Sequence, residues 1–167
     1  MSEKAKKVFL VLTIVVPFLL YCVYYYGHMI KNAPYKFSEF KSFTIIYGTA
    51  DSMLNKYNSK TGDYQYLNRQ DSLVKMNLRL SNSDLLYLHR KAAELGFWDF
   101  PSDETGDSTK VKGKPLRYYI EFAYQRKSKK VLFDESFAGD PKLRDANMNL
   151  IKEINRVLAD AEEKRKK

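Results

Sequence analysis

The stretch VFLVLTIVVPFLLYCVYYY, residues 8–26, contains no charged side chain. As an α-helix its nineteen residues span roughly 28 Å, close to the thickness of the hydrocarbon core of a bilayer. Pro17 interrupts the run, but bilayer helices tolerate proline better than soluble helices do, so we expect a kink there and not a break. The stretch therefore predicts a transmembrane helix in contact with the lipid bilayer.

A cleavable signal peptide is the main alternative for this stretch, because basic residues also precede it. Signal cleavage needs small residues before the cut. The chain offers bulky ones instead, and Tyr21 precedes Cys22 where a lipoprotein signal would have a small residue. The sequence therefore predicts an anchor that stays in the mature protein.

Lysines flank the stretch on both sides. Three lie within residues 1–7 and three more between residues 31 and 41, so the charge bias that sets membrane orientation is small. The N-terminal lysines are closer to the helix, which favours a cytoplasmic N-terminus. We expect a single-pass protein with an extracytoplasmic C-terminal domain, periplasmic if the source is bacterial.

Composition limits what the rest of the chain can be. Its length suits one domain with a core, and aromatic residues make up 14% of the chain, as expected for a folded protein. The single cysteine is Cys22, which excludes an intrachain disulfide, a thiolate metal cluster and a cysteine nucleophile in the domain. The net charge is +9, but the lysines are scattered, so no nucleic-acid binding is expected.

Hydrophobic periodicity predicts an α+β domain. Alternation of apolar and polar residues marks extended segments, which fall at residues 43–47, 52–57, 64–67, 74–80, 118–124 and 131–133. Ser81 and Asp84 provide a helix start, Leu85, Leu88, Ala92 and Leu95 form one apolar stripe, and Gly96 is placed to end that helix. A second helix opens at Asp140–Pro141 and shows an apolar stripe to Ala161.

These segments give a fold class and a domain plan. We expect a transmembrane helix followed by a two-layer domain, with an antiparallel sheet and two helices on one face in ββα–ββα order. The plan has five parts: a basic N-terminal tail (1–7), the anchor (8–26), a stalk (27–41), the α+β domain (42–162) and a basic C-terminal tail (163–167).

Candidate catalytic and metal sites are few. His89 could act as a general base, but it lies one position off the apolar stripe and is expected to face solvent. Asp103, Glu104 and Asp107 could hold a cation, but their spacing does not fit an EF-hand, and a solvated acidic loop is the preferred interpretation. No phosphate-binding loop, zinc motif or nucleophile motif is present. We therefore expect no catalytic, cofactor-binding or metal-binding residues and no cofactor.

Phe97, Trp98 and Phe100 form the sharpest aromatic cluster. They could form an interaction surface, because tryptophan and tyrosine are enriched at binding hot spots. The preferred alternative places them against the end of the preceding helix, where they close the core beneath the long loop of residues 101–114.

Three functional hypotheses follow from these patterns. The leading one is a non-enzymatic, membrane-anchored accessory or protein-interaction subunit of an envelope complex, whose partner is another membrane or envelope protein. The alternative is a membrane-tethered ligand-binding or sensing module that uses the surface around Trp98. An unrecognised hydrolase that uses His89 and a serine ranks below both.

Overall fold

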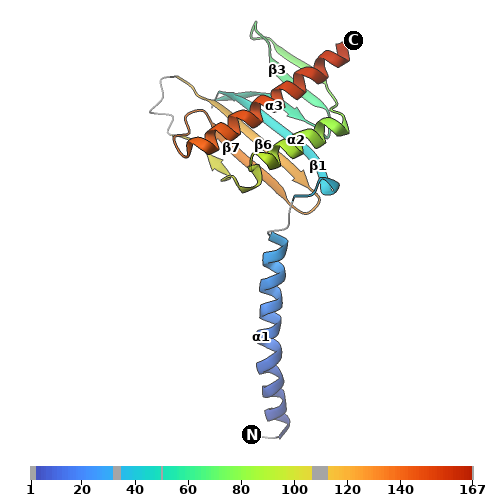
Figure 1. Ribbon diagram of the computed structural model, residues 1–167, viewed down its shortest axis with the longest axis vertical. Coiled ribbons are helices and arrows are strands. Elements are labelled where there is room, and N and C mark those ends of the chain that lie inside the picture. The colour runs from blue at the N-terminus through green and yellow to red at the C-terminus, as the bar shows by residue number, and fades with distance from the viewer. Residues whose placement is uncertain (1–2, 32–34, 50, 107–112, 167) are drawn as a thin grey trace. The chain divides into compact units, whose positions relative to one another are not determined.

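The computed structural model describes residues 3–31, 35–49, 51–106 and 113–166 (Figure 1). The chain divides into two compact units, Met1–Tyr35 and Lys36–Lys167. The predicted combination of an N-terminal apolar helix and an α+β domain is confirmed. The two units are described separately below.

The first unit is the helix α1, Glu3–Lys31, which continues through Pro17 without a break. Its section Lys4–Tyr26 is long and apolar enough to cross a membrane. The hydroxyl of Thr13 donates to the carbonyl oxygen of Phe9 (2.8 Å), so this polar group is satisfied within the helix, as an apolar solvent demands. Cleavable signal sequences meet the same criteria of length and composition, so retention in a membrane stays a prediction.

The second unit contains a seven-stranded sheet in the order β4-β3-β2-β1-β6-β7-β5. Its strands are β1 (Phe40–Thr49), β2 (Ser52–Asn58), β3 (Asp63–Leu67), β4 (Leu73–Asn77), β5 (Asp103–Glu104), β6 (Leu116–Tyr124) and β7 (Ser128–Asp134). Neighbouring strands are antiparallel except β5, which pairs with β7 in parallel.

Two parts of the predicted topology are wrong. Four strands, and not two, precede α2, so the order ββα–ββα does not hold. The sheet is mixed and not purely antiparallel, because Asp103–Glu104 of the expected polar loop adds the parallel edge strand β5. The long connection through α2 carries the chain back to the β7 edge, where a short extended segment can pair in parallel.

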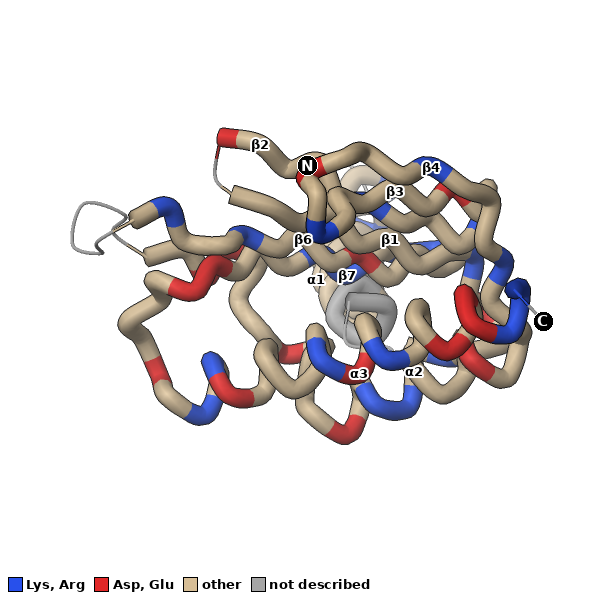
Figure 2. The backbone as a smooth tube through the Cα atoms, turned by 90° about the horizontal axis from the view of Figure 1, so that it is seen from above, with Lys and Arg blue, Asp and Glu red and all other residues tan. Residues whose placement is uncertain are grey.

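Two helices, α2 (Asn82–Glu94) and α3 (Pro141–Lys166), lie side by side on one face of the sheet (Figures 1 and 2). The capping residues of α2 are as predicted: Ser81 and Asp84 form a reciprocal capping box, and Gly96 adopts a left-handed conformation (φ 78°) just after the helix. Helix α3 starts at Pro141 as predicted and runs on to Lys166.

The core fills the space between the sheet and the two helices. The central strands contribute Phe43, Ile45, Ile120, Phe122, Val131 and Phe133, and the helices contribute Leu88, Ala92, Leu150, Ile154 and Leu158, all of them essentially inaccessible. Short 3₁₀ helices, η1 (Phe37–Glu39) and η2 (Phe97–Asp99), lie before β1 and after α2. One face of the sheet is thus committed to the core.

Candidate functional site

Within the second unit, α2 and α3 lie on one face of the sheet, and no described helix of that unit covers the other face (Figure 2). Side chains alternate between the two faces along a strand. Ile45 and its partner Tyr57 are buried on the helix side, so their neighbours Ile46 and Lys56 point to the other side. We call this surface over β1–β4 the open face; its side chains come from Thr44, Ile46, Lys56, Asn58, Gln65 and Lys75.

The open face is hollowed over β1–β4. The hollow has a volume of about 460 Å³ and a polar lining that includes Asn58, Thr61 and Asp63. Gln65 is fixed within it, because its amide nitrogen donates to the backbone oxygen of Leu54 (2.7 Å). Hydroxyl, amide, ammonium and carboxylate groups are therefore available to a molecule that enters the hollow.

Two lysines flank Gln65 in a single cross-strand row. Lys56 pairs with Gln65, and Gln65 pairs with Lys75. Neighbouring strands are about 4.8 Å apart, so the two lysine backbones are roughly 10 Å apart. Both side chains are exposed, and neither lysine forms an ion pair with any residue that the structure describes. The row presents two positive charges that form no ion pair among the described residues, and the exposed carboxylate of Asp63 lines the same hollow.

Exposed leucines border this row at one end of the sheet. Leu67 and Leu73 are partners on β3 and β4, two residues from Gln65 and Lys75 and therefore on the same face. Leu54 lies two residues before Lys56 on β2, and all three leucines are exposed. The open face thus combines apolar and cationic groups.

The aromatic cluster after α2 lies on the opposite side of the sheet, and much of it is core. Phe97 and Phe100 are buried, while Trp98 is half-buried. Phe97 and Trp98 both pack edge-on against Phe122 of β6, with ring centroids 5.4 and 5.3 Å away. Phe97 and Phe100 are thus packed in the core, as the preferred interpretation has it. Their use as an interaction surface stays a prediction, and only Trp98 keeps accessible surface for it.

His89 is buried, so the prediction that it faces solvent is wrong. The residue is 8% exposed, and its Nδ1 shares a 2.7 Å hydrogen bond with the hydroxyl of Tyr124. The rings of Phe37 and Trp98 pack against it at 5.5 and 5.4 Å. Burial, with a smaller contribution from Arg90, lowers the pKa of His89. His89 thus links the helix layer to the sheet.

The acidic residues proposed as cation ligands separate into different environments. Asp103 is exposed and accepts hydrogen bonds from Thr105 (2.7 and 3.0 Å), whereas Glu104 is completely buried. Asp107 lies outside the described residues. Among the described residues, no three His, Cys, Asp or Glu side chains gather as a metal site would need.

Two buried carboxylates, Glu104 in this segment and Asp134 at the end of the neighbouring strand β7, differ in their partners. Asp134 accepts hydrogen bonds from Ser136, from the backbone of Gly106 (3.1 Å) and from Arg117 (3.2 Å). Although burial alone would raise it, these donors hold the pKa of Asp134 below its usual value. Glu104 accepts from the side chain of Asn147 only at Oε2, and its Oε1 has no partner.

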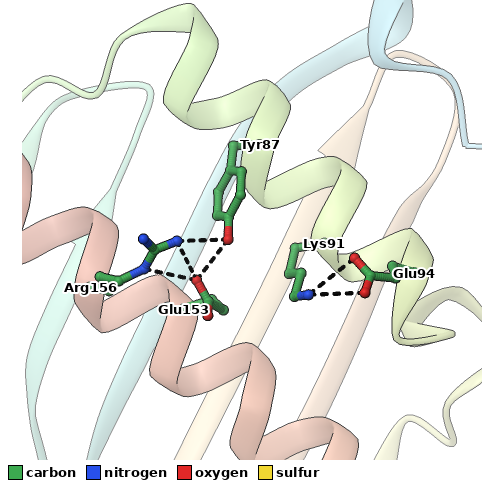
Figure 3. A network of polar contacts seen from close by, with 5 residues as sticks. All are labelled: Tyr87, Lys91, Glu94, Glu153 and Arg156. Carbon is green, nitrogen blue, oxygen red and sulfur yellow. Dashed lines mark hydrogen bonds and ion pairs between the residues drawn. The ribbon is translucent and has the colours of Figure 1, made fainter.

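The outer surface of the helix pair carries a polar network (Figure 3). The hydroxyl of Tyr87 on α2 donates to Glu153 on α3 (2.8 Å), and Arg156 donates to both residues. Lys91 and Glu94 form a separate pair on α2. The contacts of Tyr87 with Glu153 and Arg156 join the two helices, and the charged groups of this network are paired with one another.

Comparison with protein family models, with curated proteins and with solved structures finds no match for this chain.

Two features of the structure were not predicted from the sequence: the lysine row on the open face and the burial of Glu104. The Lys56–Gln65–Lys75 row depends on strand register, which residue patterns alone do not fix. The alternation of Lys75 and Asn77 with apolar residues was a signal for a polar face, but it could not show that the face stays uncovered. The burial of Glu104 had no signal in its own neighbourhood, which is polar.

Proposed function

We propose that this chain is a membrane-anchored, non-enzymatic subunit that binds another membrane or envelope protein through the open face of its sheet. The observation that supports this best is the open face itself, a sheet surface with a hollow, exposed leucines and two lysines that form no ion pair with the residues the structure describes. Contiguous exposed apolar groups next to polar ones are typical of interaction surfaces.

The charge on this face points to the chemistry of the partner. Lys56 and Lys75 flank Gln65 and form no ion pair with a carboxylate among the described residues. A protein segment that carries carboxylates at a matching spacing would neutralise both lysines, while its apolar residues would cover Leu67 and Leu73. We therefore assign an acidic protein segment as the occupant, since complementary charge favours both encounter and register.

The helix α1 supports a partner in the same membrane. Its apolar section Lys4–Tyr26 would hold the domain at the bilayer surface. Tethering two proteins to one membrane raises their effective concentration, so a surface of modest size can act without high intrinsic affinity.

Site-specific photocrosslinking tests this proposal in native membranes. A photoreactive amino acid at Gln65 of the full-length chain should give a discrete crosslinked product, and mass spectrometry should place the crosslink in an acidic segment of the captured protein. The matched control is the same amino acid at Asn155, an exposed position of α3. Equal capture from both positions, or crosslinks to lipid alone, would contradict the proposal.

Reversing the charge of the two lysines is a second test of the proposal. Lys56→Glu together with Lys75→Glu should reduce capture by about tenfold, equivalent to about 1.4 kcal/mol of binding free energy. Lys152→Glu, an exposed reversal on α3, should leave capture unchanged. If the double reversal has no more effect than Lys152→Glu, the assignment of an acidic segment as the occupant is wrong.

A ligand-binding or sensing module is the second candidate, and the polar hollow favours it. Its volume of about 460 Å³ falls within the range of small-molecule sites. This function would be supported if a small polar molecule competed with crosslinking from Gln65 and no protein were captured.

A further inference from the structure

Glu104 and Asn147 form a buried pair in which half of the hydrogen-bonding capacity is unused. Both side chains are 0% exposed. The amide nitrogen of Asn147 donates to Oε2 of Glu104 and also to the backbone oxygen of Leu143 (3.0 Å). The other two oxygens, Oε1 of Glu104 and Oδ1 of Asn147, are buried and have no partner.

An ionised Glu104 leaves this arrangement unfavourable. A carboxylate can only accept hydrogen bonds, so two acceptor oxygens remain buried without a donor, and each unsatisfied oxygen destabilises the closed form. A proton on Oε1 changes this, because the carboxylic acid can then donate to Oδ1 of Asn147 while Oε2 continues to accept from Nδ2. One proton satisfies both unpartnered oxygens.

The charged groups around the pair do not replace that proton. Lys129 on β7 is the nearby cation, but its ammonium group donates to the backbone oxygen of Phe100. Asp103 on β5 is bound by Thr105, and Asp134 at the end of β7 is bound by Arg117. Helix α3 presents the neutral Asn147. Glu104 therefore lacks the donors that keep Asp134 ionised.

We propose that Glu104 is a proton-controlled switch whose neutral carboxyl pairs with Asn147 and holds the edge strand β5 against α3, and whose deprotonation releases that strand. The proton passes to solvent when the strand opens, and the hydrogen bonds that hold β5 to β7 break in the same step. The segment that would move is short and has few attachments. It pairs with β7 over two residues, and two flanking hydrogen bonds join Leu132 to Ser102 and Gly106 to Asp134.

The direction of the pH effect follows from the burial of the group. Burial raises the pKa of Glu104 from 4.5 to about 7, and Asn147 and Lys129 oppose this only in part. A group whose folded-state pKa is raised stabilises the closed form fully below its unfolded value, and this contribution is lost as the pH rises to the folded value. The closed strand is thus favoured under acid conditions, and the switch operates between about pH 4.5 and about pH 7.

The first test needs no mutation. In the full chain, solubilised in detergent and labelled with ¹³C at the glutamate carboxyl carbons, one resonance should titrate near neutral pH. Hydrogen-bond partners outweigh burial at Glu39, Glu153 and Glu162 and hold the pKa of each below its usual value. If no glutamate carboxyl titrates near neutral pH, Glu104 is an ordinary ionised group and the switch does not exist.

The second test follows the opening itself by amide hydrogen exchange. After correction for intrinsic exchange, the opening equilibrium at the Leu132 and Gly106 amides should rise about tenfold per pH unit between about pH 4.5 and about pH 7, and then level off. Glu104→Gln, which mimics the neutral acid, should remove this dependence. Asp103→Asn, on the same strand, should keep it. A flat wild-type profile would overturn the proposal even if Glu104→Gln fails to fold.

Discussion

At the scale of single residues, the buried hydrogen bond between His89 and Tyr124 joins α2 to the sheet. The hydroxyl of Tyr124 on β6 meets Nδ1 of His89 on α2 at 2.7 Å. We expect Tyr124→Phe to lower the free energy of unfolding by about 1–3 kcal/mol, because it removes this partner from a buried polar nitrogen. Tyr119→Phe on the same strand is the control: its hydroxyl binds Glu121 in a less buried place, so a loss of about 0.5 kcal/mol is expected. Denaturant titration measures both, and equal losses would contradict the structural role of the His89 bond.

His89 also gives the domain a second pH dependence, opposite in sign to that of Glu104. Because the pKa of His89 is lowered, the folded state favours the neutral ring. Its contribution to stability is complete above the ordinary value of 6.5 and is lost as the pH falls below it. We expect the His89 ring resonances to titrate with a midpoint below 6.5 in the folded chain. A midpoint above 6.5 would show that the ring is stabilised in its charged form.

The position of His89 illustrates what residue patterns leave undecided. It lies four residues after Leu85 and three before Ala92, so it borders the apolar stripe of α2. Periodicity identifies the centre of such a stripe, but the coverage of its edge depends on other segments. Phe37 and Trp98 supply that coverage, and neither contact follows from the sequence of the helix.

At the scale of elements, the cap of α2 offers a direct measure of local stabilisation. The side chain of Ser81 accepts from the Asp84 amide (3.2 Å), and Asp84 accepts from the Ser81 amide (3.0 Å). Ser81→Ala should lower the free energy of unfolding by about 1 kcal/mol. Asn82→Ala, one residue later at an exposed position, should change it by less than about 0.5 kcal/mol. If Asn82→Ala proves as costly as Ser81→Ala, helix propensity and not the cap dominates at this end.

Elements with strong local signals were predictable, and those that depend on distant partners were not. The start and end of α2 and the start of α3 follow from Ser81, Gly96 and Pro141, which act within one turn of the chain. Strand β5 consists of two residues in a polar segment, and only the neighbouring β7 gives it an extended form. The ββα–ββα order was wrong because apolar alternation identifies strands singly and does not show how many of them join one sheet.

At the scale of the whole molecule, the open face could not have been read from the sequence. Its polar residues alternate with core residues, as in any half-buried sheet. Whether a further layer covers them depends on how many helices the chain provides, and in the second unit α2 and α3 both pack on the other face. The row of Lys56, Gln65 and Lys75 becomes a candidate site only once the structure shows on which face α2 and α3 pack.

The apolar helix α1 leads to the last prediction, which concerns the intact chain. We expect the full-length protein to remain in the membrane pellet after extraction at high pH, because Lys4–Tyr26 can span the hydrocarbon core. Leu12→Arg combined with Val16→Arg should release it, since each arginine near the helix centre costs about 2.5–3.5 kcal/mol of insertion free energy. Leu67→Arg with Leu73→Arg, on the open face, should leave the protein in the pellet. A mature chain that begins after residue 26 and is found in the soluble fraction would show that the stretch is a cleaved signal, and the open face would then have to find its partner without a shared membrane.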